Sequence, residues 1–248
     1  MSRSIRYIAA TAISLVFLTG CDPTPDDGDR GHYEAVREIA LTYGAQSGLH
    51  WKAQQITAYL DLHSDELDKI FNFNALLMKH NVLPPVVAQY GKTYQIENDH
   101  TVRISDKELK MLKPARFVSV APNWRDYIFI QYAAPEEPPE NLLPSNGYEE
   151  SLWREAIEIG WSVGVEQANA IFQNSLSILS QDFEGMVLYQ ILHAQNMISA
   201  PYTETTNLGV TGNTEGLRLN DKIITIEKPS VLNPQTQQWH PILYDENI

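Results

Sequence analysis

The chain has 248 residues, and its hydrophobic content of 43% argues against global disorder and allows one domain with a substantial core. The net charge is −13 and no basic patch is present, so we expect no direct contact with nucleic acid, where phosphate neutralisation supplies most of the affinity. Because the chain has one cysteine, it cannot form an intrachain disulfide.

The first 21 residues predict the signal peptide of a bacterial lipoprotein. A basic start precedes an apolar run over residues 7–18, which is too short to span a bilayer permanently. The run closes with Leu-Thr-Gly-Cys at residues 18–21, the lipobox pattern, in which the cysteine is acylated and the chain is cut just before it. We therefore predict a signal peptide over residues 1–20 and a palmitate-bearing anchor on Cys21. The alternative is an ordinary signal peptide with a chance cysteine.

The segment after this cysteine predicts a flexible tether. Residues 21–31 are rich in Asp, Pro and Gly and have no apolar residue beyond the cysteine. No later apolar run approaches the ~18 residues of a membrane span, so the lipid would be the attachment. Loss of residues 1–20 removes two arginines and leaves a net charge of about −15. The folded domain is expected over residues 32–248.

The N-terminal third predicts helices. Over residues 32–62 apolar side chains recur at three- and four-residue spacing, and Gly44 and Gly48 mark either a break or a close helix contact. Ser64 is placed to cap a further helical turn that has acidic residues at its start. The apolar residues expected to point inward from this turn are Leu67, Ile70 and Phe71.

The middle of the chain changes to an alternating pattern. Residues 93–97 and 101–105 alternate polar and apolar side chains around Asn-Asp, which predicts a β-hairpin. Residues 115–120 and 127–132 are β-branched and aromatic and predict strands or extended segments. Residues 133–147 contain four prolines and three glutamates and predict an extended connector.

The C-terminal part predicts a long helix and a second hairpin. Residues 148–195 have a helical pattern, in which Gly160 and Gly164 would let another element approach closely. Residues 220–222, Asn-Asp-Lys, lie between two apolar runs and predict a hairpin turn. The predicted fold class is α+β: a helix-dominated single domain with short β-hairpins in the middle and near the C-terminus. The apolar stripe of the long helix is expected at Trp153, Ile157, Trp161, Val165 and Ala168.

The sequence has no nucleophile elbow, phosphate-binding loop or zinc-binding helix motif. Its seven histidines are scattered, and no two have the i, i+4 spacing of a helical metal pair. The carboxylates of residues 65, 66 and 68 form either an acid–base cluster or, as we favour, the first turn of a helix. Residues 209–213 resemble an anion-binding loop, but a hairpin turn is the better interpretation. We expect no enzyme activity, no cofactor and no metal site.

One short segment has the residue types of a protein interface. Trp124, Arg125 and Tyr127 place two aromatic rings beside a guanidinium group, and tryptophan and arginine are enriched at interface hot spots. The competing interpretation is a local salt bridge over a buried tryptophan. Arg125→Ala would separate the two hypotheses, because it should disturb partner recovery more than thermal stability at an interface and should unfold the protein if the residue belongs to the core.

Nine segments in order along the chain resemble one family. The resemblance runs from about Tyr33 to Pro241 and points to the DotC family of type IVB (Dot/Icm) secretion systems and the related IncI-type conjugation lipoproteins. The segments that carry it are residues 41–49 (LTYGAQSGL), 71–77 (FNFNALL), 82–86 (VLPPV), 115–118 (ARFV), 122–127 (PNWRDY), 161–172, 185–189 (GMVLY), 194–197 (AQNM) and 208–212 (LGVTG).

The resemblance implies a structural role. DotC-like lipoproteins belong to a secretion core complex, where with a DotD-like lipoprotein they help place a DotH-like protein in the outer membrane, alongside DotG- and DotF-like proteins. It therefore implies a multi-copy ring, a lipid-anchored body in the periplasm and an outer-membrane location. The competing classes are a lipid-anchored periplasmic substrate-binding protein and an enzyme of unknown specificity. The sequence lacks the repeated βα units of the former and a polar catalytic cluster for the latter.

Overall fold

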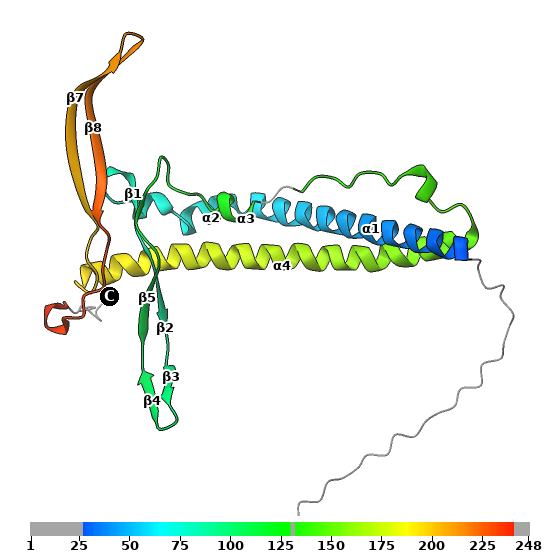
Figure 1. The fold of residues 1–248 in the computed structure, drawn as a ribbon, viewed down its shortest axis with the longest axis horizontal. Coiled ribbons are helices and arrows are strands. Elements are labelled where there is room, and N and C mark those ends of the chain that lie inside the picture. Colours follow the sequence, from blue (N-terminus) through cyan, green and yellow to red (C-terminus); the bar gives the residue numbers. More distant parts are fainter. Residues whose placement is uncertain (1–26, 130–131, 241–248) are drawn as a thin grey trace, which may run out of the picture.

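Two long helices that lie side by side form the body of the molecule (Figure 1). The structure is a computed structural model, which describes residues 27–129 and 132–240. The paired helices are α1 (Asp27–Leu62) and α4 (Gly147–Ala194). Two β-ribbons are attached near the C-terminal end of α4, and they project from opposite sides of the helical pair. The fold is α+β and helix-dominated with antiparallel hairpins, as predicted.

Small residues allow the backbones of α1 and α4 to touch. Gly44 faces the backbone of Ile157, and a Cβ atom added at this glycine would lie 2.5 Å from the Ile157 carbonyl oxygen. Gly160 and Gly164 face the α1 backbone in the same way. The close contact is therefore confirmed, and α1 runs without a break through its glycines.

The seam of α4 differs from the predicted stripe. Buried positions recur every four residues at Ala156, Gly160, Gly164 and Ala168, whereas Trp161 is 37% exposed. The helices are so close that only small side chains fit between them, and the larger side chains lie on either side of the contact.

Helix α1 also begins earlier than predicted. Its first residue is Asp27, so residues 27–31 of the predicted tether are helical. The predicted long helix is confirmed as α4. At its N-terminus, Asn146 caps the helix by accepting hydrogen bonds from the backbone N–H groups of Tyr148 and Glu149.

The short helix α2 (Ser64–Ile70) begins one residue earlier than a Ser64 cap would require. The flanking residue is His63, whose carbonyl oxygen accepts from Leu67 N–H at 3.0 Å, and no side chain caps this end. The acidic first turn is confirmed. Leu67 and Phe71 pack against the core as expected, but Ile70 is 59% exposed, so its predicted inward position is wrong.

A long β-ribbon spans residues 82–117 and crosses α4 near Gly185. Two 3₁₀ turns, η1 (Phe73–Leu76) and η2 (Lys79–Asn81), precede it. It consists of three consecutive antiparallel ladders, and the outermost confirms the predicted hairpin. From base to tip the paired strands are β1 (Val82–Leu83) with β6 (Arg116–Phe117), β2 (Val86–Tyr90) with β5 (Glu108–Lys113), and β3 (Thr93–Asn98) with β4 (Thr101–Ser105).

The segment after this ribbon differs from the structure that the sequence predicts. Residues 127–132 were expected to be extended, but helix α3 (Arg125–Ile128) covers their start. Asn123 stabilises the turn that leads into this helix, because its side-chain oxygen accepts from Arg125 N–H at 3.0 Å while its own N–H donates to Asp126. The connector that follows contains one 3₁₀ turn, η3 (Glu140–Leu142).

The second ribbon pairs β7 (Tyr202–Asn213) with β8 (Gly216–Lys228). Its turn lies at residues 214–215, where the Asn213 side chain accepts from the N–H groups of Glu215 and Gly216. The predicted turn at residues 220–222 is therefore wrong. The hairpin turn expected at residues 209–213 is also wrong, because these residues belong to β7. Asn220 has a φ of +56° and is the extra residue of a β-bulge, since Gly209 pairs with Asp221 and Val210 with Leu219.

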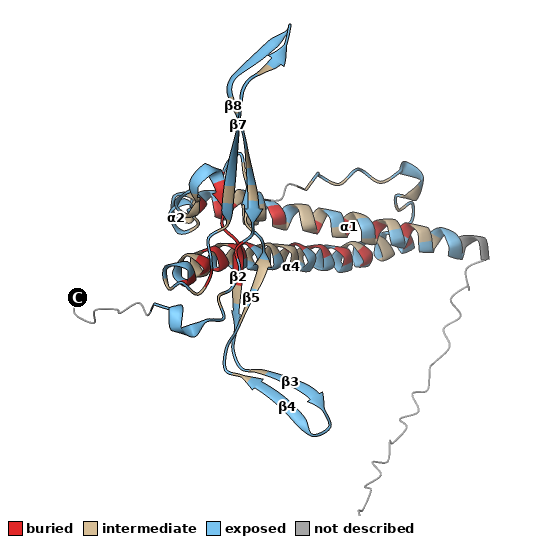
Figure 2. Ribbon diagram, turned by 60° about the vertical axis from the view of Figure 1, so that its left-hand side comes forward, coloured by how far each residue is buried: buried red, intermediate tan, exposed pale blue. Residues whose placement is uncertain are grey.

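The buried residues gather where the two helices meet the base of the first ribbon, and the far parts of both ribbons are exposed (Figure 2). The core includes Phe73, Leu83, Trp124, Leu179 and Met186. A smaller cluster around Tyr189 anchors the end of α4, beyond which the chain makes one more 3₁₀ turn, η4 (Thr236–Gln238).

Candidate functional site

Of the three residues in the predicted interface cluster, Trp124 is buried, whereas Arg125 and Tyr127 are partly exposed. Trp124 is completely buried, and its indole Nε1 donates to Asp68 Oδ1 at 2.6 Å. Arg125 donates to the same oxygen at 3.0 Å, and its guanidinium carbon lies 4.2 Å from the centre of the Trp124 ring. Trp124 is therefore not available as a surface contact, and the interpretation as a salt bridge over a buried tryptophan describes the structure.

Asp68 ties α2 to α3 through this contact. The Trp124 hydrogen bond, together with the hydrogen bond and charge of Arg125, holds the pKa of the Asp68 carboxyl below its ordinary value of 3.8. The sequence placed Asp68 in an acidic helix turn. Its long-range partner, 56 residues away, could not be read from local spacing.

Tyr127 also faces the interior. Its ring stacks on Phe73 with centroids 5.8 Å apart, and its hydroxyl donates to Asp182 Oδ2 at 3.0 Å. The Lys113 ammonium donates to the same oxygen at 2.6 Å, whereas Asp182 Oδ1 is buried without a hydrogen-bond partner. Burial and the neighbouring carboxylate raise the pKa of Tyr127. Tyr127 and Asp182 therefore join α3 to α4 and the first ribbon.

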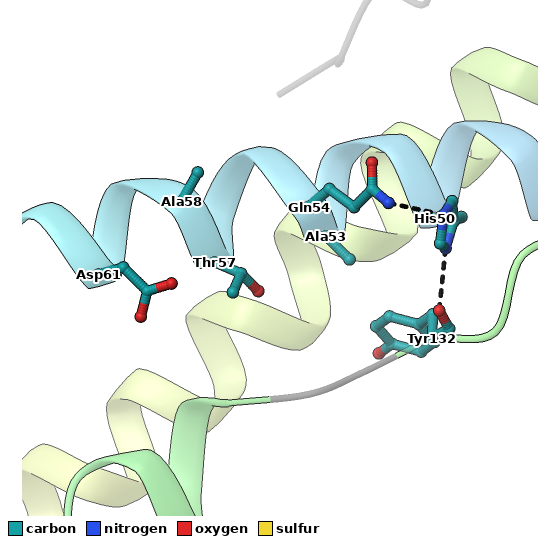
Figure 3. A pocket seen from close by; sticks show the side chains of 7 residues that line it. All are labelled: His50, Ala53, Gln54, Thr57, Ala58, Asp61 and Tyr132. Carbon is teal, nitrogen blue, oxygen red and sulfur yellow. Dashed lines mark hydrogen bonds between the residues drawn. The ribbon is translucent and has the colours of Figure 1, made fainter.

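A cavity of about 390 Å³ lies between α1 and the connector (Figure 3). The Tyr132 carbonyl can only accept, so His50 donates to it from Nδ1 at 2.9 Å, and Gln54 donates to His50 Nε2 at 2.9 Å. Both ring nitrogens of His50 are thus engaged within the molecule. Asp61 lies at the far end of the cavity, away from His50 (Figure 3). The lining residues are His50, Ala53, Gln54, Thr57, Ala58, Asp61 and Tyr132.

The tip of the first ribbon has one apolar and one polar face. Its cross-strand neighbours Tyr94–Ile104 and Ile96–Val102 share a face on which all four side chains are 52–77% exposed. On the other face Arg103 pairs with Glu97 at 2.7 Å. We call the set Tyr94, Ile96, Val102 and Ile104 the first apolar face.

The second ribbon has a similar face near its tip. Val210 pairs with Leu219, and Leu217 pairs with Gly212 on the same side; the three large side chains are 63–71% exposed. We call the set Val210, Leu217 and Leu219 the second apolar face. Contiguous exposed apolar side chains of this kind mark interaction surfaces. Sequence reasoning missed both faces, although the strict alternation at residues 94–96 and 217–219 was a usable signal.

The remaining predictions concern the lipid anchor, metal binding and membrane-spanning helices. The signal peptide and Cys21 lie outside the described residues. Across residues 27–129 and 132–240, no group of three or more His, Cys, Asp or Glu side chains is arranged to hold a metal ion. In the same residues no helix is both long and apolar enough to cross a membrane.

The family of the chain follows from a comparison with known protein families. Residues 30–241 match a family model described as type IV secretory system, conjugal DNA-protein transfer. The molecule is therefore a component of type IV secretion and conjugation machinery, which confirms the predicted association at this level. The chain belongs to the T4SS_TraI family. No curated protein matches the chain.

Proposed function

We propose that this protein is a DotC-like structural lipoprotein of a type IV secretion or conjugation core complex. The family match over residues 30–241 carries the proposal, since it assigns the chain to conjugal transfer machinery. The ordered motifs that resemble DotC narrow the role, and the lipobox at Cys21 supplies the anchor. In this role the protein assembles with a DotD-like lipoprotein and a DotH-like outer-membrane component, beside DotG- and DotF-like proteins, and performs no catalysis.

The position of the anchor sets the orientation in this proposal. Helix α1 begins at Asp27, so residues 21–26 can separate it from the lipid by at most about 20 Å. The N-terminal end of the helical pair therefore lies close to the outer membrane. The first ribbon crosses α4 at Gly185, about 57 Å along the helix from Gly147. The helical pair thus acts as a spacer that holds both ribbons away from the membrane, in the periplasm.

The second apolar face is the proposed contact for a partner protein. Its three large side chains project from a two-stranded ribbon that makes no ladder with any other strand of the described chain. An isolated ribbon of this kind is marginal in water, and a partner that covers the face would both stabilise and position it.

Co-purification from detergent-solubilised envelopes tests the proposal. The double variant Leu217→Thr/Leu219→Thr introduces β-branched side chains, which favour strands, but removes most of the apolar face. We expect it to lose its envelope partners while its thermal unfolding temperature stays unchanged. The matched control, Arg218→Thr, changes the opposite face of the same strand and should retain them. A protein that fractionates from wild-type envelopes as a lone monomer would contradict the proposal.

A further inference from the structure

A groove of about 660 Å³ lies where the first ribbon leaves α4. One wall is formed by residues 87–90 of β2, and the other by residues of α4 between positions 177 and 188. The helix residues alternate spacings of three and one, as side chains on one face of a helix do. All four strand residues line the groove, whereas a strand that presented its face would contribute every second residue. The groove therefore runs along the edge of β2.

This edge of β2 has free backbone groups. β2 forms a ladder with β5 alone, and no hydrogen bond joins residues 87–90 to any other part of the described chain. A Cβ atom added at Gly185 would lie 2.9 Å from the oxygen and 3.2 Å from the nitrogen of Val87, so both backbone groups of Val87 face α4 at the crossing. Alternate residues of an antiparallel strand direct their N–H and C=O groups to the same edge. The backbone groups of Gln89 therefore point into the groove.

The sequence leaves this edge unprotected against pairing. Residues 86–91 contain no charged side chain and no proline, the two features that commonly prevent a strand edge from adding a further strand. The partner strand β5, in contrast, carries Glu108, Lys110 and Lys113. Of the two strands, β2 is thus the one whose edge is suited to accept another strand.

The helical wall offers side chains for contact with such a strand. Ser180, Gln181 and Glu184 line the groove, and none of these side chains has a hydrogen-bond or ion-pair partner within residues 27–129 and 132–240. Tyr90, which is 43% exposed, and Leu188 add apolar surface. The volume also lies within the range of about 300–1,000 Å³ that is typical of binding pockets.

We infer that an extended segment of a partner protein binds in this groove and adds to β2 as a third strand. An extended backbone is the occupant that supplies donors and acceptors at the spacing of the β2 edge, and a lipid or small ligand does not. The main-chain hydrogen bonds provide affinity, and the side chains of α4 select among segments. This contact goes beyond the proposed function, in which the partner covers the second apolar face on the other ribbon.

Photo-cross-linking of the full-length protein in intact envelopes tests for the occupant. The probe is p-benzoylphenylalanine in place of Gln181, an exposed residue on the helical wall. We expect a cross-link to one peptide of another protein, which mass spectrometry identifies. The matched control carries the same probe in place of Asn174, which is exposed on α4 but does not line the groove, and it should not give this product.

Substitutions at Gln89 separate strand addition from other ways of filling the groove. Gln89→Pro removes the N–H that points outward but keeps the ladder with β5, so the cross-link from position 181 should fall about tenfold or more. Gln89→Thr changes the same side chain but keeps the N–H and should retain the cross-link. Ser177→Trp narrows the groove from the exposed surface of α4 without altering β2, and it should also reduce the product. Thermal unfolding of each variant verifies that it is folded.

Three results would overturn the inference. The absence of a cross-link at position 181 would show that no partner occupies the groove in the envelope. A cross-linked peptide from this same chain would identify the occupant as a second copy or another part of the molecule. A product that persists at full yield in folded Gln89→Pro would show that the backbone of β2 does not hold the occupant. Each of these results leaves the second apolar face, and with it the proposed function, unaffected.

Discussion

Gly44 of α1 and Ile157 of α4 meet backbone to backbone: a Cβ atom added at the glycine would lie 2.5 Å from the isoleucine carbonyl oxygen. No side chain separates the two helices at this point, and Gly48, Gly160 and Gly164 repeat the arrangement along the seam. The close pairing of α1 with α4 therefore depends on residues that have no side chain.

The first prediction concerns this seam. In an isolated helix Gly44→Ala would be favourable, but here the added methyl group must push two backbones apart, so we expect a loss of about 1–3 kcal/mol in the free energy of unfolding. Gly31→Ala is the matched control, because it lies in the same helix with nothing within 4 Å of the added Cβ. That variant should be neutral or stabilised by up to about 1 kcal/mol. Urea denaturation measures both, and equal effects would contradict close packing at Gly44.

The second prediction concerns acid stability. The pKa of Asp68 is lowered in the folded protein from its ordinary 3.8, chiefly by the Trp124 indole. A carboxyl with a lowered folded-state pKa stabilises the protein above its ordinary pKa, and this contribution is lost as the pH falls through the folded value. Asp68→Asn should therefore be less stable than wild type at pH 7, and the difference should shrink below pH 3.8. A difference that stays constant between pH 7 and pH 2.5 would show that the charge of Asp68 is not involved.

The third prediction concerns the hydroxyl of Tyr127. Tyr127→Phe leaves Asp182 with one donor fewer in a buried position, and we expect a loss of about 1–3 kcal/mol in unfolding free energy. Tyr94→Phe, which removes a hydroxyl from a 65% exposed ring, should change stability by less than about 0.5 kcal/mol.

Alkaline titration gives an independent readout for the same residue. The folded-state pKa of Tyr127 is raised above its ordinary 10.0, so its stabilising contribution is present below pH 10 and is lost as the pH rises above it. Wild type should lose stability in this range more steeply than Tyr127→Phe. Parallel pH curves for the two proteins would contradict burial of this hydroxyl against Asp182.

The fourth prediction concerns the anchor. Because the lipobox ends at Cys21, the mature protein should begin at this residue and carry acyl mass, which intact-mass measurement of envelope material detects. Cys21→Ser should give an unprocessed or soluble protein with weakened assembly. An N-terminus upstream of Cys21, or one without acyl mass, would contradict the lipoprotein assignment.

The features that the sequence predicted correctly depend on near neighbours in the chain. Helical spacing placed the long helix over residues 148–195, and strict alternation around Asn-Asp located the β3–β4 hairpin, because these patterns express the local periods of 3.6 and 2 residues. The small residues Gly160 and Gly164 indicated a close approach for the same local reason, since a glycine removes the side chain that would prevent it. The ordered motifs led to the type IV secretion family, which the match over residues 30–241 confirms.

Only the tertiary structure decided the features that depend on partners far along the chain. Asn220 carries the same local signal for a turn and for a bulge, and the pairing of β8 with β7 selected the bulge. Trp124 was equally suited to a surface or to the core until Asp68, 56 residues away, supplied its hydrogen-bond acceptor. The two apolar faces became recognisable once the ribbons were seen to project away from the body, because burial is a property of the packed molecule and not of a segment.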